Sequence, residues 1–398
     1  MNHTNRSKQS YLIPNYGEAP FDIIKGQGSY VWDHLGERYL DFASGIAVNT
    51  LGHCNPEFVS RVSSQMNDLI HCSNLFGIQK QRDLAEKLVH YIAPGKMLFC
   101  NSGAEANEAL LKLARLHGAK RIGKEGQNFH VICAENAFHG RTFGGMSATP
   151  QEKVQNGFAP LLEGFSFAKL NDIGSFRSKI TEQTAAIMVE TIQGEGGIHP
   201  CSTEFLKELR ALCDEHQILL ILDEVQCGIG RTGNFLAYQK AEIVPDAIGL
   251  AKGLGGGYPI GAIWVKEEFS NLFQPGSHGT TFGGSPLASA AALAVLDIME
   301  EQNLLSQVQE LSARWLPRLH DLKAEYDFIE DIRGEGLMVG IVCKQNPANF
   351  IQQLRNSKLI TVPAGGNVIR LLPPLNVTQE QLDWALSTMK QTLSNLQK

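Results

Sequence analysis

The chain has 398 residues, a formal net charge of −6, 43% hydrophobic residues and 19% charged residues. This length exceeds what one small core organises, so two domains, or one large and one smaller, are expected. The mildly acidic balance argues against nucleic acid as the main partner, because phosphate binding requires a basic field. No segment has the apolar length of a membrane helix, and the polar start MNHTNRSKQS lacks the apolar core of a signal peptide.

The eight cysteines are scattered, and no pair has CxxC spacing. In a chain of this size the pattern indicates reduced, mostly packed thiols rather than a disulfide framework or a zinc site. We therefore expect a cytoplasmic protein without a metal site.

The N-terminal third predicts short strands, then two helices, then a candidate anion site. Short strands are expected within 21–42, a loop of small and polar residues from residue 44, and helices over roughly 56–70 and 79–93. The strand MLFC is followed by a turn at 101–103 and a helical pattern over 104–116. Free backbone N–H groups at such a helix start suit a phosphate, although an ordinary Ser N-cap is the commoner explanation.

Between residues 128 and 245 strand and helix signals alternate. Strands are expected over 129–135, 165–170 and 185–190, and helices near 172–182 and 202–216. Alternation at this spacing predicts βαβ units and a largely parallel sheet within one large domain.

Two charged residues follow consecutive buried strands of this region. The apolar run 219–222 leads directly into Asp223, and the next strand signal, PDAIGL, delivers Lys252 into a loop rich in glycine. Ligands bind beyond the carboxyl ends of such strands. Singly, Asp223 is most often a turn residue and Lys252 a solvated charge. Together they match a pyridoxal phosphate site, where a lysine forms a Schiff base and an acid keeps the pyridine nitrogen protonated.

The C-terminal third predicts a smaller domain. An alanine-rich helix follows the Gly/Ser/Thr turn near 276–285, and a helix at about 304–323 leads to four strand signals with helices near 347–357 and 378–396. We divide the chain into an N-terminal arm with short strands that packs with the small domain (1–50), a large domain (51–305) and a small C-terminal domain (306–398).

Eight strings of residues, in this order, make the chain resemble the class III, fold type I pyridoxal phosphate-dependent aminotransferases. They are YVWDHLGERYLDFASGIAVNTLGH, NSGAEANEA, FHGRTFG, VETIQGEGGI, LDEVQCGIGRTG, LAKGLGGGYPIGA, HGTTFGG and NVIRLLPPL. The resemblance covers nearly the entire chain. It implies an α/β fold, with a large domain whose mostly parallel sheet is flanked by helices and a smaller α+β C-terminal domain. It also implies pyridoxal 5′-phosphate as cofactor, small amino and keto acids as substrates, and a homodimer with shared active sites.

The resemblance implies a cofactor site around Lys252. This lysine is expected to form the Schiff base and to move the substrate proton, which is helped by burial because burial lowers the pKa of a lysine. Asp223 is expected to pair with the pyridinium nitrogen, and Gln226 to lie near the ring oxygen. The other implied contacts are Ser102, Gly103 and Ala104 at the phosphate, Phe138 and Val225 against the ring, and Thr281 at the phosphate of the neighbouring subunit.

The resemblance also implies two carboxylate clamps, because guanidinium groups bind carboxylates through two parallel hydrogen bonds. Arg141 is expected to bind the α-carboxylate of an acylated amino acid, and Arg370 that of glutamate or 2-oxoglutarate. Glu195 is expected to neutralise Arg370 when the ω-amino substrate is present, and Thr280 to lie beside the substrate. Without the motif, each arginine would be interpreted as a member of a surface ion pair.

Within the family, the chain looks most like members that transaminate N2-acetylornithine with 2-oxoglutarate in arginine biosynthesis. The resemblance implies that family members acting on free ornithine carry a tyrosine around the positions of Gly45 and Ile46, where it holds the free α-amino group. This chain has no tyrosine there, which favours an acylated substrate. The alternatives are an ω-aminotransferase of ornithine, succinylornithine or 4-aminobutyrate, and a pyridoxal phosphate mutase or decarboxylase. A nucleotide-binding protein is disfavoured, because GxxxxGK[ST] is absent and GLGGGYPIG does not match GxGxxG.

Overall fold

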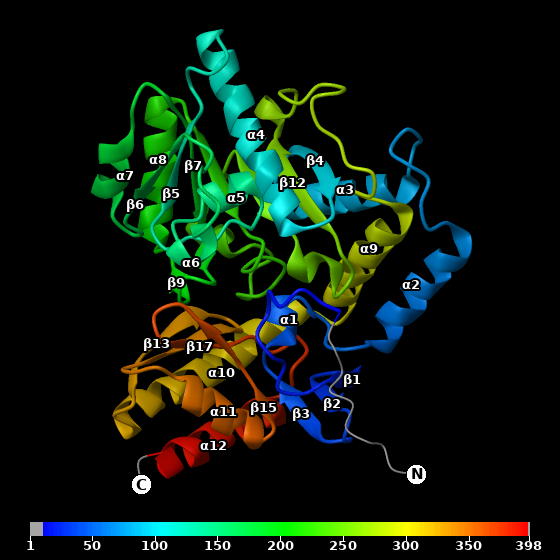
Figure 1. Cartoon of the computed structure of the whole chain (residues 1–398). Helices are drawn as coiled ribbons and strands as arrows, with labels where there is room; N and C mark the ends of the chain where they lie inside the picture. The colour runs from blue at the N-terminus through cyan, green and yellow to red at the C-terminus, as the bar shows by residue number, and fades with distance from the viewer. Residues whose placement is uncertain (1–10, 397–398) are drawn as a thin grey trace.

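A seven-stranded sheet forms the centre of the computed structural model, which describes residues 11–396 (Figure 1). The strand order is β4-β12-β11-β10-β7-β5-β6. The strands are β4 (Gly95–Cys100), β5 (His130–Ala134), β6 (Phe165–Ala168), β7 (Thr184–Glu190), β10 (Leu219–Asp223), β11 (Ala247–Leu250) and β12 (Gly261–Lys266). Within this described sheet, β12 alone is antiparallel to its neighbours. The sheet is mostly parallel as predicted, but β12 was not predicted as a separate strand.

Helices cover both faces of this sheet, and all residues of β7 and β10 are buried. Because successive side chains of a strand point to opposite faces, β10 contributes to two apolar clusters. Leu219 and Ile221 belong to the cluster of α4 (Gly103–Ile122), and Leu220 and Leu222 to that of α8 (Thr203–His216). The other helices of this part are α2 (Pro56–Asp68), α3 (Gln79–Ile92), α5 (Phe143–Ser147), α6 (Glu152–Gln155), α7 (Ile173–Lys179) and α9 (Pro286–Glu301).

The two ends of the described chain meet in a separate set of strands, below the large sheet in Figure 1. β1 (Ile23–Gln27), β2 (Tyr30–Asp33) and β3 (Arg38–Asp41) form one sheet with β15 (Leu359–Ile360). A second four-stranded sheet has the order β13-β14-β17-β16. Its strands are β13 (Ile329–Glu335), β14 (Met338–Cys343), β16 (Val362–Ala364) and β17 (Val368–Leu371), and the accompanying helices are α10 (Leu304–Glu325), α11 (Ala348–Asn356) and α12 (Gln379–Leu396).

A strained turn connects this lower part to the large sheet. The sequence pattern predicts a plain loop here, but α1 (Ser44–Ala47) is a single turn with positive φ at every residue, including +65° at Ile46. A β-branched residue rarely adopts this conformation. The carboxylate of Asp41 holds the turn by accepting hydrogen bonds from Ala43 N (2.8 Å) and Ser44 N (3.1 Å). The turn places Val48, which follows it, at the wall of a cavity.

The remaining short strands, β8 (Ile192–Gln193) and β9 (His199–Pro200), form a two-stranded ribbon. None of the helices within residues 11–396 is both long enough and apolar enough to cross a membrane.

Candidate active site

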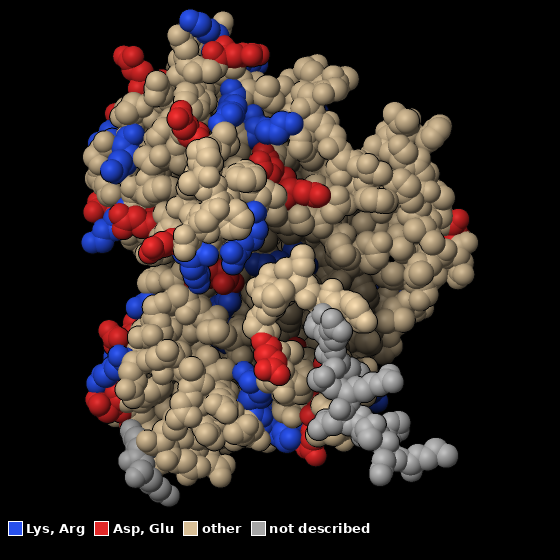
Figure 2. Space-filling view, in the orientation of Figure 1, with Lys and Arg blue, Asp and Glu red and all other residues tan. Residues whose placement is uncertain are grey.

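A cavity of about 420 Å³ lies at the carboxyl ends of the parallel strands, against the strained turn. Nine of the thirteen residues that the sequence predicts for the site line this cavity: Ser102, Gly103, Ala104, Phe138, Arg141, Asp223, Val225, Gln226 and Lys252. Figure 2 shows the surface hollowed between the upper and lower parts of the molecule, with Lys and Arg side chains along the edge of the hollow. The structure therefore brings together residues that are up to 150 positions apart in the sequence, from Ser102 to Lys252.

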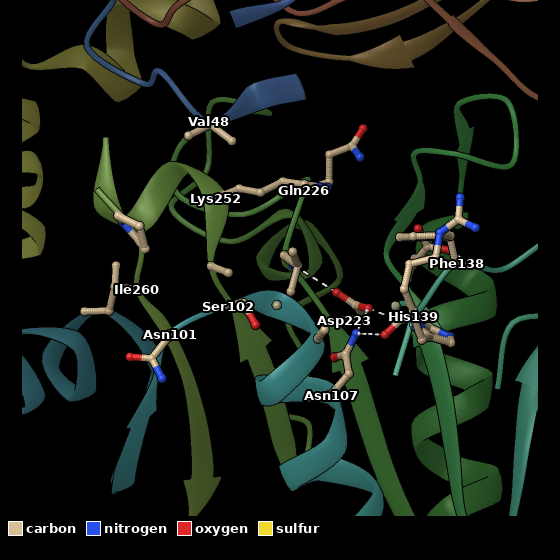
Figure 3. Close-up of a pocket in the computed structure, with 18 of the residues that line it drawn as sticks. Val48, Asn101, Ser102, Asn107, Phe138, His139, Asp223, Gln226, Lys252 and Ile260 are labelled. Carbon is tan, nitrogen blue, oxygen red and sulfur yellow. Dashed lines mark hydrogen bonds and ion pairs between the residues drawn. The ribbon is translucent and has the colours of Figure 1, made fainter. Parts of the chain in front are cut away.

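Asp223 is the last residue of β10 and is buried at the floor of the cavity (Figure 3). Its Oδ2 atom accepts a hydrogen bond from Asn107 Nδ2 (2.7 Å) and lies 2.8 Å from His139 Nδ1, and its Oδ1 atom accepts from Val225 N (3.0 Å). Burial by itself raises the pKa of this carboxyl, but the hydrogen bonds and the charge of His139 outweigh it and hold the pKa below the ordinary value. Asp223 is therefore ionised at neutral pH.

His139 and Asn107 are site residues that the sequence interpretation missed. His139 is fully buried, which lowers its pKa, yet its hydrogen bond to Asp223 raises the pKa well above the ordinary value. Asn107 also donates to the backbone oxygen of His139 (2.9 Å), so the three side chains form one connected group. Both residues lie inside motifs that were recognised, FHGRTFG and NSGAEANEA, but their hydrogen bonds to Asp223 become visible only in the fold.

Lys252 follows β11 and enters the cavity from the side opposite His139 (Figure 3). Its backbone is strained, with φ +39°. Burial lowers the pKa of its amine, and no residue of the described chain forms a hydrogen bond or ion pair with Nζ. An amine in this state loses its proton more readily than a solvated lysine, as condensation with a carbonyl group requires.

The start of α4 forms another wall of the cavity. Ser102 caps the helix, and its Oγ atom accepts a hydrogen bond from Glu105 N (3.2 Å). The first N–H groups of a helix lack intrahelical partners and attract anions. A Cβ atom at Gly103 would lie 2.7 Å from Val225 Cγ1, so glycine is required for the helix start to approach this side chain.

The two predicted clamp arginines occupy different environments. Arg141 lines the cavity and is exposed, with its guanidinium 5.7 Å from the ring centre of Phe138. Arg370 is buried, with 2% exposure, and its guanidinium pairs with Glu195 (2.6 Å) and donates to Gln226 Oε1 (3.1 Å). Arg370 and Glu195 are outside the cavity lining, but Gln226 connects them to it.

Thr280 and Thr281 do not line the cavity. Thr280 Oγ1 accepts a hydrogen bond from Asn101 Nδ2 (3.0 Å), and Thr281 is exposed. Within the described chain, these two residues therefore lie outside the cavity lining to which Lys252 belongs.

The residues around the cavity fit pyridoxal 5′-phosphate. The helix start suits the phosphate, the apolar Phe138 and Val225 suit the faces of the ring, and the ionised Asp223 suits a protonated pyridine nitrogen. The buried amine of Lys252 suits the aldehyde.

Comparisons with known proteins agree with this geometry. The family model of class III aminotransferases matches residues 11–393. The acetylornithine aminotransferase of Caldanaerobacter subterraneus subsp. tengcongensis is 45% identical, covering 98% of each chain, and that of Bacillus subtilis is 45% identical, covering 97% of this chain and 98% of the relative.

Two solved structures show how broadly the fold is shared. The acetylornithine aminotransferase of Elizabethkingia anophelis superposes with a TM-score of 0.87 at 34% identity, covering 96% of each chain. The ornithine aminotransferase of Toxoplasma gondii superposes with a TM-score of 0.94 at 31% identity, covering 97% of this chain and 93% of that chain. The backbone is thus common to enzymes named for different substrates. From its family match and its relatives, the chain belongs to the class III aminotransferases, enzymes that use pyridoxal phosphate to transfer an amino group between amino and keto acids.

Proposed function

We propose that the protein transfers the δ-amino group of N2-acetylornithine to 2-oxoglutarate, giving N-acetylglutamate 5-semialdehyde and glutamate in arginine biosynthesis. The observation that carries the proposal is the asymmetry of the two arginines: Arg141 lines the cavity without an ion pair to any residue within 11–396, and Arg370 is neutralised by Glu195. The names of the relatives that are 45% identical over nearly the whole chain support the same substrate.

The proposed mechanism assigns a task to each side chain at the cavity. Bound pyridoxal phosphate supplies a carbonyl that condenses with amines and a ring that accepts electrons. Lys252 would hold the cofactor through its amine, and as a free amine it would move the proton of the carbon that bears the substrate amino group. Asp223 would keep the ring nitrogen protonated, and Gln226 would lie near the ring oxygen. The remaining cofactor contacts are Ser102, Gly103 and Ala104 at the phosphate and Phe138 and Val225 at the ring faces.

The proposed mechanism uses a different arginine for each of the two substrates. Arg141 binds the α-carboxylate of N2-acetylornithine while Glu195 neutralises Arg370, so the acylated end meets no unpaired charge. In the second half-reaction Glu195 releases Arg370, which binds the α-carboxylate of 2-oxoglutarate.

We also propose a homodimer in which Thr281 reaches the cofactor phosphate of the partner subunit and Thr280 lies beside the substrate. The exposure of Thr281 supports this arrangement, as do the exposed apolar side chains of Leu75, Phe76 and Phe282. Sedimentation of the holoenzyme tests it, and a monomer that retains full activity would refute it.

The proposed domain division places residues 1–50 with a small domain 306–398, beside a large domain 51–305; within it, residues 1–10 and 397–398 lie outside the described part of the chain. Its support is the pairing of β3 with β15 and the position of residue 305 at the start of α10. We further propose a cytoplasmic location, which the eight free cysteines support.

The visible absorption of the holoenzyme tests the proposed substrate. N2-acetylornithine, added without a keto acid, is expected to bleach the cofactor band, and 2-oxoglutarate is expected to restore it. The alternative substrate is free ornithine, the substrate for which the Toxoplasma gondii enzyme is named. If N2-acetylornithine leaves the cofactor band unchanged and ornithine bleaches it, free ornithine is the substrate.

A further inference from the structure

Glu190 is a buried carboxylate of the cavity to which the proposed mechanism assigns no task. It ends β7, stands directly beside Asp223 in the parallel register of β7 and β10, and lines the same cavity. Its exposure is 6%. A carboxyl group is rarely buried to this extent unless its oxygens have partners, so its contacts indicate what it does.

The two oxygens of Glu190 accept hydrogen bonds from two different loops. Oε2 accepts from the backbone N–H of Phe138 (3.0 Å), and Oε1 accepts from the backbone N–H of Gly194 (3.2 Å). Phe138 lies three residues before Arg141, and Gly194 immediately precedes Glu195. One carboxylate therefore connects the loop that carries the first clamp to the loop that carries the neutralising partner of the second.

Several charged groups surround Glu190, but within the described chain only the two backbone N–H groups donate hydrogen bonds to its carboxylate. Burial raises its pKa to about 7, the neighbouring Asp223 raises it as well, and His139 and the two backbone hydrogen bonds lower it. Lys252 faces it across the cavity, and Cys201 Sγ donates to its backbone oxygen (3.4 Å). No side chain of the described residues donates a hydrogen bond to the Glu190 carboxylate, so a backbone N–H from each loop is all that holds it.

We propose that Glu190 is a positioning residue that sets both substrate clamps at once, by fixing the Phe138–Arg141 loop and the Gly194–Glu195 loop to the end of β7. This inference rests on the proposed division of labour between Arg141 and Arg370. The coupling is built into the backbone: neither loop can move away from β7 without leaving one buried carboxylate oxygen without its partner.

Amide hydrogen exchange of the protein tests the proposal directly, with and without pyridoxal phosphate. In Glu190→Ala, which removes both acceptors, the N–H groups of Phe138 and Gly194 are expected to exchange at least about tenfold faster. In Glu190→Gln the side chain keeps one acceptor oxygen and turns an NH2 group toward the other loop, so one of the two amides is expected to lose protection.

Steady-state kinetics then connects each loop to one substrate. Glu190→Ala is expected to raise KM about tenfold for both the amino donor and 2-oxoglutarate. In Glu190→Gln, KM is expected to rise for the amino donor if Phe138 loses protection, and for 2-oxoglutarate if Gly194 does. A KM increase for a substrate whose loop stays protected, or unchanged exchange at both amides in Glu190→Ala, would overturn the proposal.

Glu224→Gln is the matched control. Glu224 is also buried beside Asp223 and also accepts two backbone hydrogen bonds, from Ala237 N (2.9 Å) and Tyr238 N (3.0 Å); unlike Glu190, it accepts side-chain hydrogen bonds as well, from Thr191 Oγ1 (2.6 Å) and Cys227 Sγ (3.4 Å). This variant is expected to lose protection at Ala237 or Tyr238 and to keep both KM values. The wild-type enzyme separates the two proposals: if it rejects N2-acetylornithine, the proposed substrate is wrong, and the exchange experiment still tests Glu190.

Discussion

The surroundings of Arg141 and Arg370 contrast in burial and in ion pairing. Arg141 stands exposed at the cavity, on a loop that α5 follows, whereas Arg370 lies within β17 with 2% exposure and an ion pair to Glu195. A buried guanidinium without partners is costly, and Arg370 has three among the described residues: the carboxylate of Glu195, Gln226 Oε1 (3.1 Å) and the backbone oxygen of Pro363 (3.1 Å). An exposed guanidinium keeps its hydration until a substrate arrives. In the proposed mechanism, Arg141 therefore recognises a carboxylate by gaining a partner, and Arg370 by exchanging Glu195 for one.

Removing the amine of Lys252, which both half-reactions use in the proposed mechanism, gives the largest expected effect. Lys252→Ala is expected to lower turnover about 10⁴-fold or more, because the proton acceptor at the reacting carbon is lost. Both half-reactions should fall together, and pyridoxal phosphate should remain bound without a covalent bond, which its absorption spectrum and dialysis would show. Normal turnover in this variant would show that Lys252 does not have the proposed catalytic role.

Removing one arginine at a time separates the two regions. Arg141→Ala is expected to raise KM for N2-acetylornithine about 100-fold, the value of a charge-assisted pair of hydrogen bonds, with a much smaller change for 2-oxoglutarate. Arg370→Ala is expected to show the converse, together with lower stability because Glu195 and Gln226 lose their partner. Equal increases for both substrates in both variants would contradict the contrast.

Removing the charge of Glu195 tests the role of its ion pair with Arg370 while both arginines are kept. In Glu195→Gln, Arg370 keeps a hydrogen-bond acceptor but is no longer neutralised. The half-reaction of N2-acetylornithine is expected to slow about tenfold, and that of glutamate to change less, as single-turnover absorption would show. Glu215→Gln removes an exposed ion pair with Arg177 instead, and should leave both half-reactions unchanged.

The smallest expected effect is the pH dependence that Glu190 gives to the free energy of unfolding. Burial raises the pKa of Glu190 from 4.5 to about 7, so between these pH values the folded chain holds a proton that the unfolded chain has released. The contribution of Glu190 to the free energy of unfolding is therefore greatest below pH 4.5 and falls as the pH rises to about 7, by at most about 1.4 kcal/mol per pH unit. Denaturant unfolding of the wild type and of Glu190→Gln across this range should differ in slope; parallel curves would contradict the assignment.

Many local elements and the fold class followed from the sequence. The end of β10 at Asp223, the cap at Ser102 and the alternation that makes a mostly parallel sheet all result from local patterns of apolar and turn residues. The antiparallel β12 was missed, because the glycine-rich stretch before it hides where a new strand begins. The turn over Ser44–Ala47 was missed because positive φ at Ile46 contradicts the preference of that residue.

The sequence by itself therefore determined the family, the cofactor chemistry and the local position of the side chains on strand ends and helix starts. Only the tertiary structure decided which of these side chains meet. Asn107 and His139 converge on Asp223 from 116 and 84 positions away, and Arg370 meets Glu195 across 175. Such pairs depend on how strands and loops are ordered in space, and no periodicity along the chain records that order. The proton states depend on the same packing: Asp223 and Glu190 end adjacent strands, yet hydrogen bonds lower the pKa of the first and burial raises that of the second.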